Sequence, residues 1–198
     1  MSDILCLYYS RTGKTRAVMN DVAEALGAEC VEITDGVDRS GALGFFMSGI
    51  DAMRRGTHRT QPFQTERDLE DYPLVILGTP IWAGRCSSVM RGFLKRQGLE
   101  LQNVAYVLTR SSEHKDEDIF DQMDLYTANR HLAGASICYD SVGYHFWRDQ
   151  FVSEVRNVFA ALPALPPRDK TVTVFEEKAE EKPRRRRRRS RPEKRDAG

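Results

Sequence analysis

The chain has 198 residues, with 30 Lys and Arg against 29 Asp and Glu, a balance typical of an ordinary water-soluble protein. That balance hides two different parts, because residues 176–198 hold 11 basic and 6 acidic side chains while residues 1–175 hold 19 basic and 23 acidic ones. No apolar run reaches the roughly 18 to 20 residues of a membrane-spanning helix, and the amino terminus lacks the pattern of a secretion signal. We therefore expect a cytoplasmic protein without a membrane span.

Short apolar runs alternate with stretches of helical periodicity along the chain. The expected strands cover residues 4–9, 29–33, 74–77, 104–108 and 135–139, and the expected helices cover residues 14–27, 43–53, 89–94, 119–126 and 151–162. Parallel strands need crossover connections, and helices supply them. The alternation therefore predicts an α/β fold, a doubly wound five-stranded parallel sheet with helices on both faces.

The composition changes after residue 165. We expect one domain over residues 1–165 and a disordered Arg-rich tail over residues 166–198, because the tail lacks the apolar side chains that would offset the entropy of ordering. Arg184 to Arg189, followed by Arg191, form a dense cationic cluster. Two interpretations stay open for it: a solvated tail, or a segment that binds nucleic acid or an anionic membrane surface.

Cysteine and histidine spacings give no sign of a metal site. The four cysteines are far apart, with no CxxC pair, and the four histidines form no HExxH or similar pattern. In a chain of this size the cysteines are expected to be reduced thiols.

The loop between the first strand and the first helix has the features of a phosphate site. It comprises Ser10, Arg11, Thr12, Gly13, Lys14 and Thr15. Backbone N–H groups at a helix amino terminus carry the positive end of the helix dipole, and hydroxyls and a glycine add donors and close approach. An ordinary Ser/Thr cap is the alternative. A nucleoside triphosphate loop is disfavoured, because its first glycine would stand where this chain has Tyr8.

Two segments resemble the flavodoxin family, over about residues 3–162. LYYSRTGKTRAVMNDVAEAL is similar to the FMN phosphate loop of flavodoxins, and VILGTPIWAGRCSSVMRGFL is similar to their flavin-ring loop. SGALGFFMSGIDAMRRGT resembles the second-helix region of flavodoxin-family proteins. The resemblance implies the flavodoxin strand order 2-1-3-4-5, with FMN at the carboxyl ends of the strands.

The resemblance also assigns the ring contacts. Pro80, Ile81, Trp82, Ala83 and Gly84 would place the isoalloxazine ring, with Trp82 stacked on the ring or against its edge. A core or rim aromatic is the alternative for Trp82. Cys86 falls at the expected start of the third helix, where we interpret it as a passive small residue rather than a redox thiol.

A third loop would contact the pyrimidine side of the ring through Thr109, Arg110 and Ser111. It departs from the flavodoxin pattern, because SSEHKDED replaces the glycine-rich stretch of related proteins. Arg110 has two interpretations of equal weight: a cation that raises the flavin potential, or a surface ion pair with the acidic helix that follows.

The resemblance implies an FMN-binding redox protein in which no residue acts as a conventional acid or base. Two versions are open: an electron carrier that docks on redox partner proteins, and an FMN-dependent oxidoreductase that uses NAD(P)H and a small acceptor such as a quinone. A third hypothesis, of another class, is a flavin-free interaction module with the same fold. The oligomeric state is not predicted.

Overall fold

The computed structural model describes residues 2–37, 57–111 and 118–163, all within one compact unit, Met1–Leu165. The predicted helix at 43–53 and the Arg-rich tail lie outside the described residues. The elements in chain order are β1 (Ile4–Tyr8), α1 (Lys14–Leu26), β2 (Glu29–Glu32), the 3-10 turn η1 (Leu69–Asp71), β3 (Leu74–Trp82), β4 (Arg85–Cys86), α3 (Ser88–Gln97), the 3-10 turn η2 (Gly98–Glu100), β5 (Val104–Arg110), α4 (Asp118–Asp124), β6 (Ala133–Cys138) and α5 (Tyr144–Ala160).

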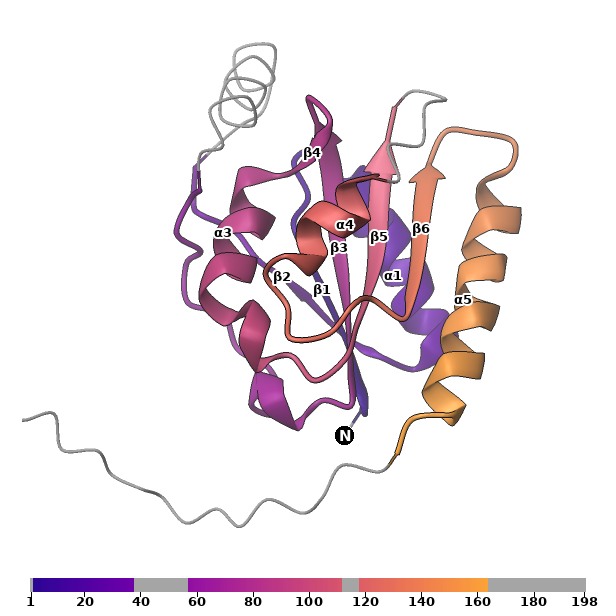
Figure 1. The fold of residues 1–198 in the computed structure, drawn as a ribbon. Helices are drawn as coiled ribbons and strands as arrows, with labels where there is room; N and C mark the ends of the chain where they lie inside the picture. Colours follow the sequence, from indigo (N-terminus) through magenta and orange to yellow (C-terminus); the bar gives the residue numbers. More distant parts are fainter. Residues whose placement is uncertain (1, 38–56, 112–117, 164–198) are drawn as a thin grey trace, which may run out of the picture. The chain divides into compact units, whose positions relative to one another are not determined.

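The sheet has the order β2-β1-β3-β5-β6, and all four of these pairings are parallel (Figure 1). This confirms the predicted doubly wound fold and its strand order. The two-residue strand β4 was not predicted. It pairs antiparallel with the end of β3, so that β3 and β4 form a hairpin where the sequence indicated only a loop.

Both faces of the sheet are buried, and side chains alternate between them along each strand. Leu5, Leu7 and Val75 belong to one apolar core together with Phe93 of α3. Cys6 and Ile76 belong to the other core, which α1 and α5 cover. The strands are apolar at consecutive positions because helices cover the parallel sheet on both sides, as the sequence predicted.

Helices α1, α3 and α4 begin and end within three residues of the predicted bounds, and α5 departs further. Helix α1 ends at Leu26, one residue before the expected end at Gly27. Helix α5 begins at Tyr144, seven residues before the expected start at Phe151. Its first two turns carry aromatic and polar side chains without an apolar stripe, which is why periodicity did not mark them.

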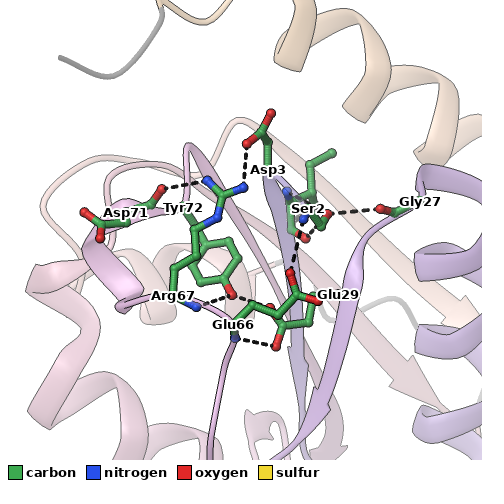
Figure 2. Close-up of polar contacts among 9 residues, drawn as sticks. Ser2, Asp3, Gly27, Glu29, Glu66, Arg67, Asp71 and Tyr72 are labelled. Carbon is green, nitrogen blue, oxygen red and sulfur yellow. Dashed lines mark hydrogen bonds and ion pairs between the residues drawn. The ribbon is translucent and has the colours of Figure 1, made fainter. Parts of the chain in front are cut away.

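A polar network ties the chain that precedes β3 to the start of the sheet (Figure 2). Arg67 donates from Nη2 to Asp3 Oδ1 at 2.8 Å, and the Tyr72 hydroxyl accepts from the Arg67 backbone N–H at 3.2 Å. The Tyr72 hydroxyl also donates to Glu29, whose other oxygen accepts from the Glu66 backbone N–H at 3.0 Å. Tyr72 is fully buried, so these bonds satisfy a phenol that water does not reach.

No helix in the described ranges is long and apolar enough to cross a membrane.

The network predicts an alkaline limit to stability. Burial, and secondarily the hydrogen bond to Glu29, raise the pKa of Tyr72 from 10 to about 12. The folded state therefore holds this proton more tightly than the unfolded state. The unfolding free energy should be undiminished below pH 10 and should fall by on the order of 2 kcal/mol as the pH rises to 12.

Urea unfolding of the parent and of Tyr72→Phe across this pH range measures the effect. The variant is expected to be less stable at neutral pH, because Glu29 loses a donor, but to show a shallower decline above pH 10. Parallel declines in the two proteins would contradict the assignment to Tyr72.

Candidate functional site

The first loop folds around the side chain of Ser10. Ser10 Oγ accepts hydrogen bonds from the backbone N–H groups of Gly13, at 3.1 Å, and Arg16, at 3.2 Å. Gly13 precedes the first residue of α1 and has φ +88°, a conformation that glycine adopts without strain. The first-turn N–H groups of Lys14 and Thr15 have no carbonyl one turn earlier in the helix. The loop thus presents the positive end of α1, as the sequence predicted.

Basic side chains surround this helix start. Lys14 forms an ion pair with Asp140, a residue that follows β6, and the side chains are 42% and 60% exposed. Arg16 pairs with Glu32 of β2 at 2.7 Å, pointing to the neighbouring strand. Asp140 was not among the predicted site residues. Its position directly after the last strand was the available signal, because every strand end of a parallel sheet meets the same edge.

A buried hydroxyl pair joins the first loop to the third. Thr15 Oγ1 and Thr109 Oγ1 lie 2.7 Å apart, and the two residues are 2% and 6% exposed. Neither hydroxyl has ready access to water, so each depends on the other for its hydrogen bond. The contact holds the start of α1 against the end of β5. Both residues were predicted to bind a cofactor, and in the structure their hydroxyls bond to each other while both residues line the cleft described below.

The second loop is a hairpin rather than an open loop. Pro80, Ile81 and Trp82 continue β3, and Ala83 and Gly84 form the turn to β4. Both turn residues have positive φ, +46° and +68°, as a two-residue hairpin turn of type I′ requires. Positive φ is strained at Ala83 because its Cβ atom crowds the backbone, whereas a glycine would adopt this conformation without strain.

The base of the hairpin is closed by buried hydroxyls. Thr79 Oγ1 accepts from the Ser87 backbone N–H at 3.1 Å and donates to Ser87 Oγ at 3.0 Å. Ser87 Oγ in turn accepts from the Met90 N–H at 3.2 Å and caps α3. The hairpin and α3 are thereby held together as one unit.

Trp82 combines the two interpretations that the sequence left open. It is 7% exposed, belongs to the core on the α3 side, and meets the Tyr9 ring edge-on with centroids 5.5 Å apart. The same residue also lines the cleft described below. Most of its ring is therefore core, and only a small part faces the cleft. Tyr8 and Tyr9 are buried, as expected for the first strand.

Cys86 lies in β4, and not at the start of α3 as the sequence indicated, because the hairpin occupies the residues before the Ser87 cap. Burial raises the pKa of the Cys86 thiol to about 11. A thiol protonated at neutral pH is a poor nucleophile, which supports the passive interpretation. All four cysteines are free, and the described residues hold no cluster of three or more His, Cys, Asp or Glu suited to a metal ion.

The three loops meet in one shallow cleft of about 70 Å³ at the carboxyl ends of β1, β3 and β5. All ten residues that line it are ones that the sequence analysis selected: Arg11, Thr12, Lys14, Thr15, Pro80, Ile81, Trp82, Thr109, Arg110 and Ser111. Ser10, Gly13, Ala83 and Gly84 belong to the same loops but do not line the cleft. Ser10 instead binds its own loop, and the other three shape the backbone.

The cleft has a positively charged side, which suits an anionic group, and an apolar side next to it. Arg11, Lys14 and Arg110 carry positive charge, and none of the described residues that line the cleft carries negative charge. Pro80, Ile81 and part of Trp82 form an apolar wall. The small volume means that a ligand larger than a few atoms would lie across the mouth of the cleft with one side in solvent. The arrangement suits a phosphate ester joined to a flat ring.

No protein-family model matches the chain. Two curated proteins named NAD(P)H dehydrogenase (quinone) are similar to part of it. The protein from Cupriavidus metallidurans is 35% identical over 98 residues, and that from Azorhizobium caulinodans is 33% identical over 102 residues. Each match covers 50% of this chain and 48% of the relative, so the chain spans about half the length of the curated relatives it matches.

Solved structures share the fold over most of the chain. A Bacteroides eggerthii structure superposes with a TM-score of 0.64 at 16% identity, over 79% of this chain and 97% of the other. A Lactobacillus acidophilus flavoprotein in complex with FMN gives 0.56 at 19% identity, over 73% and 97%. A flavodoxin, WrbA-like protein from Agrobacterium tumefaciens gives 0.55 at 17% identity, over 81% and 98%. The chain has the flavodoxin-like fold, and the predicted resemblance is confirmed.

The buried hydroxyl pair predicts non-additive mutational effects. Thr15→Val alone, or Thr109→Val alone, should cost about 1 kcal/mol or more of unfolding free energy, because one hydroxyl stays buried without a partner. The double variant removes both hydroxyls and should cost less than the sum. Urea unfolding of the four proteins gives a coupling energy expected near 1 kcal/mol. Strict additivity would show that the two hydroxyls do not depend on each other.

Proposed function

We propose that this domain binds FMN in the cleft and is a flavodoxin-like redox protein. The carrying observation is the convergence of ten lining residues from three loops on one cleft with a cationic side and an apolar side. The FMN phosphate would lie against the amino terminus of α1, and the ring against Pro80, Ile81 and Trp82. Bound FMN accepts and passes on electrons, which is the chemistry that the protein side chains lack.

The side chains of the cleft hold and tune the cofactor. Thr12 and the N–H groups of Lys14 and Thr15 would donate to the phosphate, and Arg11 and Lys14 would balance its charge. Arg110 lines the same cleft, where its positive charge would favour electron density on the flavin and so raise its reduction potential. The buried pair of Thr15 and Thr109 keeps the phosphate loop and the third loop at a constant spacing.

We infer that the domain works as an FMN-dependent oxidoreductase with NAD(P)H as electron donor and a quinone as acceptor. The name of the two curated relatives supports this version over a carrier between proteins. The positive charges of Arg11, Lys14 and Arg110 support it too, since they attract an anionic nicotinamide nucleotide. A cytoplasmic location, where NAD(P)H is supplied, belongs to the same proposal.

The visible absorption spectrum tests the proposal most directly. The purified full chain is recorded before and after addition of FMN and removal of unbound cofactor, and then under anaerobic conditions with NADH or NADPH. We expect a retained flavin spectrum that bleaches on addition of the nicotinamide nucleotide. Bleaching only with dithionite would identify a carrier instead of an oxidoreductase. A protein that retains no FMN would contradict the proposal and favour the flavin-free interaction module.

Lys14 gives a sharper test of the phosphate position. Lys14→Met removes a cation and leaves the Asp140 carboxylate without its partner, so FMN affinity should fall by about threefold to tenfold. Affinity for riboflavin, which lacks the phosphate, should not change. Fluorescence titration with the two flavins measures both.

Lys95→Met is the matched control, because Lys95 is an exposed lysine on α3 whose ammonium lies over the Tyr126 ring, and it does not line the cleft. It should leave both affinities unchanged. Equal losses of FMN and riboflavin affinity in Lys14→Met would place the phosphate elsewhere.

A further inference from the structure

A second and larger hollow lies along β6, the last strand of the sheet. Its volume is about 320 Å³, and its lining comes from β6, the residues before it, α4 and α5. It shares no lining residue with the proposed flavin cleft. In the described part of the chain β6 pairs only with β5, so one edge of its backbone has no neighbouring strand. Backbone carbonyl and N–H groups are therefore available along this hollow.

His131 enters this hollow in a defined orientation. Its backbone N–H donates to Asp124 Oδ1 at 3.0 Å, and its Nδ1 lies 2.9 Å from Asp124 Oδ2. The Asp124 side chain is only 8% exposed, whereas that of His131 is 24% exposed. A carboxylate accepts hydrogen bonds, so Nδ1–H donates to Asp124, and in the neutral form of the ring Nε2 is an acceptor.

Aromatic rings form the walls around His131. Its ring lies 5.3 Å from the ring of Phe120 and 5.2 Å from that of Tyr106, centroid to centroid. Gly134 of β6 leaves room for the rings of Phe120 and His131. A Cβ atom at this position would lie 3.1 Å from the Phe120 ring and 3.4 Å from His131 Cδ2. Trp147 of α5 also lines the hollow.

The charge of this hollow is opposite to that of the flavin cleft. Among the described residues that line it, Glu154 alone carries a full formal charge, and Gln150 stands one turn before it on α5. The carboxylate of Asp124 lies directly behind His131. The polar side chains of the lining are thus the Glu154 carboxylate, the His131 imidazole, the Gln150 amide and the Ser136 hydroxyl, with aromatic faces beside them. Aromatic faces attract cations.

We propose that the β6 hollow is a binding site for a small organic ammonium ion with a flat apolar body. The ammonium donates to the Glu154 carboxylate and to His131 Nε2, and the apolar body lies between Phe120 and Trp147. The volume is at the lower end of small-molecule sites, which favours a ligand of one ring with a short amine arm. The site goes beyond the proposed redox function and does not depend on it.

The experiment is isothermal titration of the full chain with 2-phenylethylammonium at neutral pH, repeated with FMN present. We expect saturable one-to-one binding that is independent of FMN. Glu154→Gln should weaken it by about threefold to tenfold, because the variant removes one partly solvated charge contact. The matched control is Glu24→Gln, an exposed helix glutamate on α1, which should bind as the parent does.

A second variant and a neutral ligand complete the test. Gly134→Ala pushes on Phe120 and should abolish binding while a thermal melt shows a folded protein. 2-Phenylethanol has the same ring and chain length without the charge, and should bind at least about tenfold more weakly. Absence of binding to the parent would overturn the proposal. So would equal affinity for the alcohol, or an unchanged affinity in both Glu154→Gln and Gly134→Ala.

Discussion

Parallel pairing of β1 with β3 and of β3 with β5 is the constraint on which the rest of the structure depends. Parallel neighbours cannot be joined by a tight turn, so the chain must pass over one face of the sheet to return to its starting edge. The helices in these crossover connections bury both faces of the sheet. The same geometry brings the carboxyl end of every strand to one edge (Figure 1). Three loops that are far apart in sequence, after β1, β3 and β5, therefore meet there, and the cleft that they form is a consequence of the strand order.

Buried hydroxyls turn these neighbouring loops into a shaped site. Thr15 and Thr109 join the first and third loops, while Thr79 and Ser87 close the β3–β4 hairpin on the cap of α3. A buried hydroxyl without a partner is costly, so these pairs favour one arrangement of the loops over others. The charged side chains around them, such as Lys14 and Asp140, remain partly solvated and free to respond to a ligand. The loop backbones are thus held in place by buried hydrogen bonds, while the charged side chains beside them are partly exposed and can adjust to a ligand. A backbone positioned before the ligand binds is typical of cofactor sites.

The cleft at the strand ends and the hollow beside β6 differ in charge and in position. The cleft is lined by cations that the helix dipole of α1 reinforces. In the described part of the chain the hollow lies at the edge of the sheet, where Glu154 lines it and Asp124 bonds to His131. The proposed FMN and the proposed ammonium ligand would therefore occupy separate sites of opposite charge.

The strands, the helices and the phosphate-type loop could be predicted from local patterns in the sequence, whereas the strand order and the residues of the second and third loops were predicted from the resemblance to flavodoxins. Apolar runs mark buried strands, and a loop such as SRTGKT carries its chemistry in consecutive residues. The β3–β4 hairpin could not be predicted, since it rests on positive φ at Ala83, a residue without turn preference, and on hydrogen bonds between Thr79 and Ser87 across the hairpin. The orientation of His131 was likewise decided by how the chain turns from α4 to β6, which brings Asp124 against the imidazole. The Lys14–Asp140 and Thr15–Thr109 contacts join residues 126 and 94 positions apart, and such contacts leave no periodic trace in a single sequence, because they depend on how the sheet brings its strand ends together.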